Sequence, residues 1–253
     1  MSGHNKWSTI KHKKGKADAI RGRVFTKVIR EITLAARVGG GDPDANAQLR
    51  KTLLDAKAAN MPKHNIERAI AKGTGELEGV SFHDITYEGY GPNGVAVLVD
   101  VVTDNRNRTV AEVRHIFSKY GGKTAEPNSV AYLFEPQGQI TLQRGDVPED
   151  EMMLLALDAG ANDVEAVEGE DGVYSVTTDP TTVWTVRDAL EEAGFEIEGA
   201  EIAKVAATTI ELGGGEAATM LRMVDAFDDN DDVQRVWANF DLDEAALAEM
   251  ENE

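Results

Sequence analysis

The sequence lacks cysteine, has few aromatic residues and contains no long apolar run. Without Cys, disulfides and thiolate metal sites are excluded, a composition that fits a reducing compartment. No apolar segment approaches the length of a membrane span. The positive charge near the N-terminus is not followed by the apolar segment of a secretory signal. We therefore expect a cytoplasmic protein that does not associate with membranes.

Recognisable catalytic and ligand-binding motifs are also missing. No G-x-x-x-x-G-K-[ST] or strand-linked G-x-G-x-x-G segment is present, and no Ser lies in a nucleophile elbow. The five His residues are scattered without H-x-x-x-H spacing. The run "DDNDD" (228–232) has Val233 and Asn239 where an EF-hand loop requires Gly and Glu, so it predicts a polar turn. The sequence predicts no enzyme, no catalytic residue, no metal site, no cofactor and no small-molecule substrate.

Basic residues are scarce but concentrated at one end. The chain has 26 Lys and Arg against 45 Asp and Glu, a net charge of −19. Residues 1–72 hold 16 basic and 6 acidic residues, net +10, whereas residues 73–253 hold 10 and 39, net −29. A basic excess that spans a whole domain of an acidic chain predicts contact with a polyanion, and nucleic acid is the partner that we expect.

The stretch from Asp18 to Val38 has the pattern of an amphipathic helix. At about 100° per residue, its apolar side chains fall within an arc of roughly 140° and its basic side chains within roughly 80° on the opposite side. The apolar set is Val24, Phe25, Val28, Ile29, Ile32, Ala35 and Ala36, and the basic set is Arg23, Lys27, Arg30 and Arg37. Since Arg23, Lys27 and Arg30 are outside the apolar arc, we expect replacement of all three by Glu to leave the core intact.

The candidate nucleic-acid contacts fall into three groups. A lead-in segment contributes Lys6, Trp7, Lys11, Lys13, Lys14 and Lys16, and the helix contributes Arg23, Lys27, Arg30 and Arg37. Trp7 has two open interpretations, stacking on a base or packing against its own domain. Arg106 and Arg108, at a strand-to-helix turn, are a second contact or instead form hydrogen bonds with neighbouring acids at the helix start.

The first 78 residues are predicted to form a basic domain of three helices. Asp42-Pro43 has the pattern of an N-cap followed by Pro at the first helical position, which predicts a second helix to about Asn60. The third helix starts at Pro62 and is closed by Gly73. A Gly-rich linker, "GTGELEGVS" (73–81), follows.

Strands and helices alternate beyond the linker. The segments from "QITLQ" to "FEIEGAEI" have the order βαββαβ, which is ferredoxin-like. The flanking strands "VAVLVDVV", "VAYLF", "VAATTIEL" and "VQRVWANF", with two helices, complete a second βαββαβ set. We therefore predict an α+β protein in which domain three (135–204) is inserted into domain two (79–134 plus 205–240), followed by an acidic tail (241–253). Two consecutive domains without insertion remain the alternative, and insertion requires Phe134 and Val205 to lie near each other.

Several long blocks resemble the YebC/PmpR family. They are "GHNKWSTIKHKKGKADAIRGRVFTK", "GGGDPDAN", "YEGYGPNG", "TDNRNRTVAEVRH" (the family has Ser at the position of Thr103) and "SVAYLF". The resemblance spans nearly the whole chain, and blocks of this length are far more specific than a short motif. The acidic tail "DLDEAALAEMENE" is part of no such block.

This resemblance implies a cytoplasmic bacterial protein with an N-terminal helical domain and two α/β domains, without established catalytic residues. It implies a transcriptional regulator that binds DNA. It also implies a rival function, because mitochondrial relatives resemble translational activators and bacterial members are connected to the ribosome. Ribosomal RNA is therefore the alternative partner. A third hypothesis, a protein-binding module that uses the acidic α/β domains, would make residues 1–78 dispensable.

Overall fold

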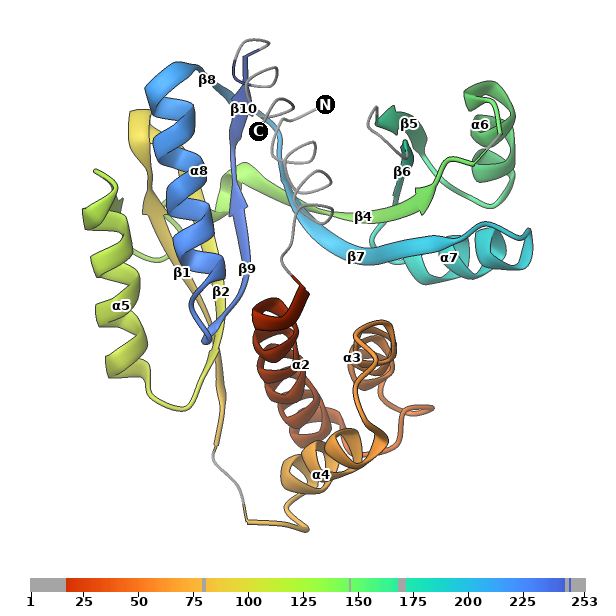
Figure 1. Ribbon diagram of the computed structural model, residues 1–253, viewed down its shortest axis with the longest axis horizontal. Coiled ribbons are helices and arrows are strands. Elements are labelled where there is room, and N and C mark those ends of the chain that lie inside the picture. Colours follow the sequence, from red (N-terminus) through yellow and green to blue (C-terminus); the bar gives the residue numbers. More distant parts are fainter. Residues whose placement is uncertain (1–16, 79–80, 146, 168–171, 244–245, 247–253) are drawn as a thin grey trace. The chain divides into compact units, whose positions relative to one another are not determined.

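The computed structural model describes residues 17–78, 81–145, 147–167, 172–243 and 246 (Figure 1). The chain forms two compact units. One contains Tyr132–Ile210 and Asn239–Asp241, and the other contains the described residues before Tyr132 together with Glu211–Ala238 and the residues from Leu242 onward. Within the described residues, no helix has the length and apolar character that a membrane span requires.

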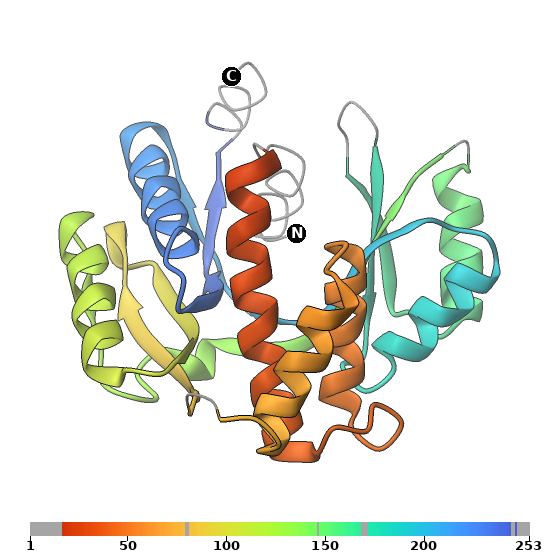
Figure 2. The ribbon, with the colours of Figure 1, turned by 60° about the horizontal axis from the view of Figure 1, so that its bottom comes forward.

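The N-terminal region forms the three predicted helices, α2 (Ala17–Gly39), α3 (Ala47–Ala58) and α4 (Lys63–Thr74), which pack against one another (Figure 2). The apolar arc of α2 provides much of the shared core, as its periodicity predicts. The buried members of this core are Val28, Ile32, Ala35, Leu49, Ala56, Met61 and Ala69.

The predicted start of the second helix is wrong. Asn46 is the N-cap, and its side-chain oxygen accepts a hydrogen bond from the Leu49 amide at 3.1 Å. Its amide nitrogen donates to the carbonyl oxygens of Ala35 and Gly40, both at 2.8 Å. Because the buried Asn46 caps α3 and also satisfies two carbonyls at the end of α2, it is a better cap than Asp42.

The predicted end of the third helix is also wrong. Gly73 lies inside α4, and the left-handed residue that follows the helix is Gly75, with φ 83°. Gly73 is required for another reason. A Cβ at this position would collide with the Thr33 carbonyl oxygen and lie 2.7 Å from the Cβ of Ala36. The glycine therefore allows α4 to approach α2 closely.

Domain two contains a four-stranded antiparallel sheet in the order β3-β1-β2-β9. The strands are β1 (His83–Tyr90), β2 (Ala96–Thr103), β3 (Lys123–Thr124) and β9 (Val233–Ala238). Helices α5 (Arg106–Lys119) and α8 (Gly214–Asp228) lie side by side over one face (Figure 1). They meet at Phe117 and Phe227, whose rings pack edge to face with centroids 5.0 Å apart.

The predicted strand at 130–134 is wrong, and β1 is not among the predicted strands. Ala131–Leu133 forms a 3-10 turn, and Phe134 begins β4 of the next domain. The reason is Glu88, a buried residue of β1. Its carboxylate accepts hydrogen bonds from the amides of Asn128, Val130 and Ala131, so these amides do not pair with a strand. Burial alone raises the pKa of Glu88, but these hydrogen bonds outweigh it and lower the pKa below its ordinary value.

Domain three has the predicted order βαββαβ. Its elements are β4 (Phe134–Gln143), α6 (Glu149–Asp158), β5 (Asp163–Val167), β6 (Val173–Thr178), α7 (Val183–Glu192) and β7 (Ile197–Ala206). The sheet order is β5-β6-β4-β7. This ferredoxin-like arrangement, together with the three N-terminal helices, confirms the predicted α+β fold class.

The insertion is confirmed by strand pairing. Phe134 pairs with Ala206 and Glu135 with Val205, so the chain enters and leaves domain three at one point. β9 pairs with β2, which returns the chain to the sheet of domain two. The segment "VAATTIEL" is divided between β7 and β8 (Ile210–Leu212), and β8 pairs with β10 (Phe240–Leu242) in a two-stranded sheet. The boundary between the two units falls within β8 and β10.

Candidate nucleic-acid interface

Half of the predicted contact residues are on described parts of the chain. Those outside the described residues are Lys6, Trp7, Lys11, Lys13, Lys14 and Lys16. Those described are Arg23, Lys27, Arg30 and Arg37 on α2, and Arg106 and Arg108 in the first turn of α5.

The basic side of α2 faces an acidic segment of domain two. This segment, residues 228–232, connects α8 to β9 and is called the acidic turn below. Arg23 pairs with the carboxylate of Asp229, and the Lys27 Nζ donates to the Asp228 carbonyl oxygen at 3.0 Å. The run "DDNDD" is therefore a polar turn, and it is the partner of the basic helix face.

Arg30 makes the most buried contact between α2 and the acidic turn. Its Nη1 lies 2.6 Å from Asp232 Oδ1, and the two side chains are only 15% and 3% exposed. The same nitrogen donates to the carbonyl oxygen of Asp231. Arg23 and Asp229, by contrast, are 42% and 66% exposed. The α2 contacts thus range from a buried ion pair to a solvated one.

Asp232 is the centre of a hydrogen-bond network. Besides Arg30, its carboxylate accepts from the Oγ1 of Thr109 at 2.6 Å, the Oγ1 of Thr103 at 3.2 Å and the Nη2 of Arg108 at 2.7 Å. Burial alone raises the pKa of Asp232. The hydrogen bonds from Thr109 and Arg108, with the charge of Arg30, outweigh burial and lower the pKa below its ordinary value. Asp232 is therefore ionised at neutral pH.

The two arginines of α5 differ in their surroundings. Arg108 donates to Asp104 at 2.8 Å as well as to Asp232, and these hydrogen bonds raise its pKa. Of the two interpretations given for Arg106 and Arg108, hydrogen bonding to acids at the helix start is therefore the one that applies to Arg108. Arg106 is exposed, and its Nη2 lies 3.1 Å from the Nδ1 of His83.

The acidic turn is the feature that sequence reasoning missed. Arg30 and Asp232 are 202 residues apart in the chain, and no helical or strand period connects them. The available signal was charge, because a run of four acids in five residues is complementary to the basic side of α2. Among the described residues, no group of His, Asp and Glu side chains is arranged to hold a metal ion.

Two family models match nearly the whole chain. The TACO1/YebC protein N-terminal domain matches residues 5–76, and the TACO1/YebC second and third domain matches residues 82–240. The chain belongs to the TACO1/YebC family. This confirms the resemblance to YebC/PmpR proteins.

Relatives within the TACO1/YebC family align over their full length. A "probable transcriptional regulatory protein" of Geobacter sulfurreducens is 57% identical over 242 residues, which cover 96% of each chain. A protein with the same description from a Sulfurihydrogenibium species is 51% identical and covers 99% of this chain and 100% of its own. These names identify a family of regulatory proteins.

A solved structure has the same fold. The crystal structure of the conserved hypothetical protein Aq1575 from Aquifex aeolicus matches with a TM-score of 0.84 and 46% identity, and the alignment covers 94% of this chain and 97% of that one. The α+β architecture is therefore shared with that protein.

Proposed function

We propose that this TACO1/YebC protein is a cytoplasmic, DNA-binding transcriptional regulator without catalytic activity, and that its basic helical domain contacts DNA phosphates. The observation that carries the proposal is the basic side of α2, which lies outside the apolar core of the helical domain. On this side Arg37 is exposed, and Arg23 and Lys27 are partly exposed beside the acidic turn. The lysines of residues 6–16 and Trp7, which lie outside the described residues, are further candidate contacts from the sequence, and Arg106 is an exposed candidate on domain two. Cations in this number dominate affinity through counterion release.

The acidic turn competes with phosphate for the same side chains. A solvated ion pair such as Arg23–Asp229 contributes about 0–1 kcal/mol, so phosphate replaces it at low cost. The buried pair of Arg30 with Asp232 is more costly to break, because separation removes one of the two arginines that neutralise a buried carboxylate. Arg30 and Arg108 therefore act mainly by positioning α2 against the acidic turn, and Arg23, Lys27 and Arg37 make direct phosphate contacts.

The footprint on nucleic acid is local. Residues 73–253 carry a net charge of −29, which repels an extended phosphate backbone. The test is the affinity of the full chain for duplex DNA, measured by fluorescence anisotropy at several salt concentrations. The proposal predicts that log affinity falls linearly with log salt, with a slope of several units. Absence of binding at low salt, or affinity that does not depend on salt, would refute it.

A ribosome-associated translation factor that binds ribosomal RNA is the second candidate. The observation that favours it is the acidity of domain three, where residues 135–204 contain 18 acidic and 3 basic residues. A duplex that wraps the protein is disfavoured, whereas RNA loops and single strands offer the compact targets that a Lys-rich segment suits. Sedimentation of cell lysate with and without nuclease separates the two candidates. Stable co-migration with ribosomal subunits favours translation, and recovery only with specific chromosomal fragments favours transcription.

A further inference from the structure

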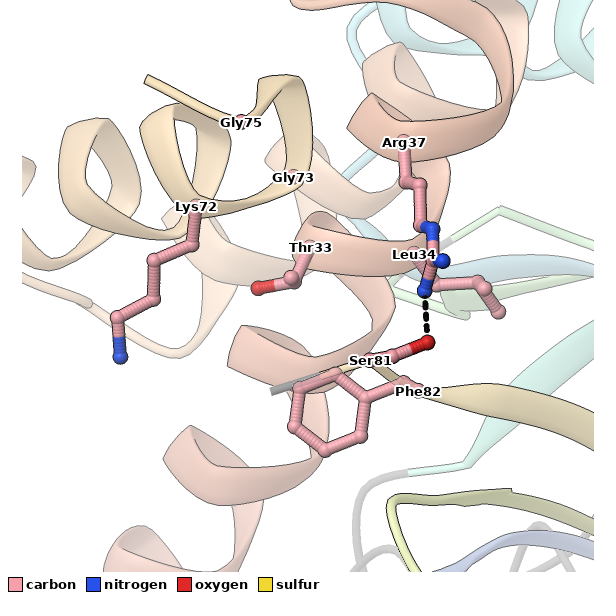
Figure 3. Close-up of a pocket in the computed structure, with 8 residues that line it drawn as sticks. All are labelled: Thr33, Leu34, Arg37, Lys72, Gly73, Gly75, Ser81 and Phe82. Atoms are coloured by element: carbon pink, nitrogen blue, oxygen red, sulfur yellow. Dashed lines mark hydrogen bonds between the residues drawn. The ribbon is translucent and has the colours of Figure 1, made fainter. Parts of the chain in front are cut away.

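A pocket lies where the last turns of α2 and α4 meet the residues that lead into β1. Its volume is about 190 Å³, well above the roughly 30 Å³ that one water molecule takes. Figure 3 shows Arg37 and Lys72 extending from the two helices on either side of Thr33. The lining residues are Thr33, Leu34, Arg37, Lys72, Gly73, Gly75, Ser81 and Phe82.

The lining is positively charged and contains no acidic residue. Within the described part of the chain, neither Arg37 nor Lys72 forms an ion pair. Other cations of the helical domain are neutralised, as in the pairs Lys51–Asp55 and Lys63–Glu67. Arg37 donates to the Ser81 hydroxyl, which uses one of its five N–H donors and keeps the guanidinium at the pocket wall.

The close approach of α4 to α2 creates this pocket. Gly73 packs against the Thr33 carbonyl and the Arg37 backbone nitrogen, so the residue before it in α4, Lys72, comes to the same opening as Arg37. The Phe82 ring completes the wall, and the Arg30 guanidinium lies 5.8 Å from its centroid. The pocket therefore joins the basic side of α2 to the end of α4.

We propose that this pocket binds a phosphate group of the nucleic-acid backbone, held by Arg37, Lys72 and the hydroxyl of Ser81, whereas the Thr33 hydroxyl donates to the Ile29 carbonyl oxygen at 2.8 Å and is not a donor to the phosphate. The inference rests on the proposed nucleic-acid binding and deepens it, because Lys72 and Ser81 are outside the predicted contacts. Arg37 supplies a planar fork of donors and Lys72 a compact charge, a combination suited to phosphate oxygens. Leu34 and Phe82 supply an apolar wall beside these charges, which lowers the local dielectric and strengthens both interactions.

Two helix C-termini also lie near the pocket, and their dipoles oppose an anion. Each end is equivalent to about −0.5 elementary charge. The two side chains carry a full positive charge each, so the pocket stays positive after this opposition. A purely structural role, in which Arg37 and Lys72 only offset the helix ends, predicts lower stability of their variants without any change in nucleic-acid binding.

The test compares Lys72→Gln with Arg68→Gln in the full chain. Arg68 is a matched control because it is an exposed cation of the same helix and does not line the pocket. Affinity for a duplex DNA and for an RNA hairpin is measured at about 50 and 200 mM salt. Each phosphate contact contributes about 0.9 to the slope of log affinity against log salt. Lys72→Gln loses one contact, so its drop in affinity between the two salt concentrations should be about three- to fourfold smaller than that of the wild type. Arg68→Gln should show the wild-type drop. Arg37→Gln should reproduce the effect from a different helix.

Two further arms identify the source of the phosphate. Inorganic phosphate, titrated while the amide signals of Gly75 and Ser81 are followed by NMR, detects a free anion. Single-stranded oligonucleotides with and without a 5′-phosphate detect a terminal phosphate. If the pocket binds an internal backbone phosphate, the two oligonucleotides bind with equal affinity, and Lys72→Gln weakens the binding of both. Whichever source of phosphate binds, the pocket claim requires that Lys72→Gln weakens its binding.

The pocket claim is overturned if Lys72→Gln and Arg37→Gln keep wild-type affinity and salt dependence while Arg23→Gln weakens binding. That result would remove Arg37 from the proposed phosphate contacts and leave nucleic-acid binding through Arg23 standing. If the wild-type chain binds none of these nucleic acids, the proposed function itself fails. Thermal denaturation of each variant separates a lost contact from a lost fold.

Discussion

Arg30 of α2 and Asp232 of the acidic turn form a buried ion pair that connects the helical domain to domain two. Their Nη1 and Oδ1 atoms are 2.6 Å apart, and Arg108 contacts the same carboxylate from α5. The basic side of α2 is therefore part of the folded structure as well as the candidate nucleic-acid surface. The expectation that its residues are replaceable without structural cost holds only where their partners are solvated.

Replacement of Arg30 by Gln is expected to destabilise the protein. Breaking a buried pair costs about 3–5 kcal/mol when the remaining charge has no other partner. Asp232 keeps Arg108, Thr109 and Thr103, so we expect a smaller loss of about 1–3 kcal/mol in the free energy of unfolding. Urea denaturation measures it. Arg23→Gln is the control, with an expected change of at most about 1 kcal/mol, and equal effects of the two variants would contradict the account.

The stability that Asp232 supplies should depend on pH. The pKa of its carboxyl is lowered in the folded protein, so its contribution is present above the unfolded value of about 3.9 and is lost as pH falls through the folded value. The difference in free energy of unfolding between the wild type and Asp232→Asn should therefore be constant above about pH 5 and shrink below about pH 4. A difference that grows on acidification would show that the sign is wrong.

Replacement of Asp229 by Asn should strengthen nucleic-acid binding. The change removes the carboxylate that pairs with Arg23 and one negative charge beside the expected phosphate positions. We expect a gain of about two- to fivefold in affinity at low salt, which disappears at high salt because exposed charges are screened. Glu192→Gln makes the same change of charge at an exposed position of domain three and should have no effect. An equal gain in affinity in both variants would show that the gain comes from net charge alone and not from the Arg23–Asp229 pair.

Replacement of Gly73 by Ala should separate α4 from α2. The new methyl group would collide with the Thr33 carbonyl oxygen, and overpacking of this kind costs about 1–3 kcal/mol. Gly215→Ala is the matched helical control, because a Cβ there meets nothing within 4 Å. The control should be neutral or slightly stabilising, since Ala favours helix over Gly by up to about 1 kcal/mol. Thermal denaturation distinguishes them, and a neutral Gly73→Ala would show that the close packing is not required.

Local patterns predict most of the fold. The apolar arc of α2 and the βαββαβ order follow from periods of 3.6 and 2, and the number of strands on each side of domain three indicates the insertion. Phe134 and Val205 lie together because the strands that begin and end the insertion must pair. Asp42-Pro43 has a stronger local cap pattern than Asn46, yet Asn46 is the cap because it also satisfies carbonyls of α2.

Features that depend on distant residues do not follow from local patterns. Glu88 bonds the amides of residues 128–131, and so "VAYLF" is not a strand of domain two. The acidic turn and the basic side of α2 are each evident in the sequence, but nothing local indicates that they meet. The positions of the candidate contacts were accessible to sequence reasoning, whereas their intramolecular partners were not.

The central claim, that the basic side of α2 binds phosphate, is tested most directly by the double variant Arg23→Gln/Lys27→Gln. Arg23 pairs with the exposed Asp229 and the Lys27 Nζ donates to the Asp228 carbonyl oxygen, and thermal denaturation checks that the double variant is folded. Lys57→Gln/Arg68→Gln removes two exposed cations elsewhere in the helical domain and is the control. The measurement is the slope of log affinity against log salt for duplex DNA and for ribosomal RNA. The account predicts a slope about two units flatter in the double variant and unchanged in the control. A folded double variant with wild-type affinity and slope for both nucleic acids would contradict it.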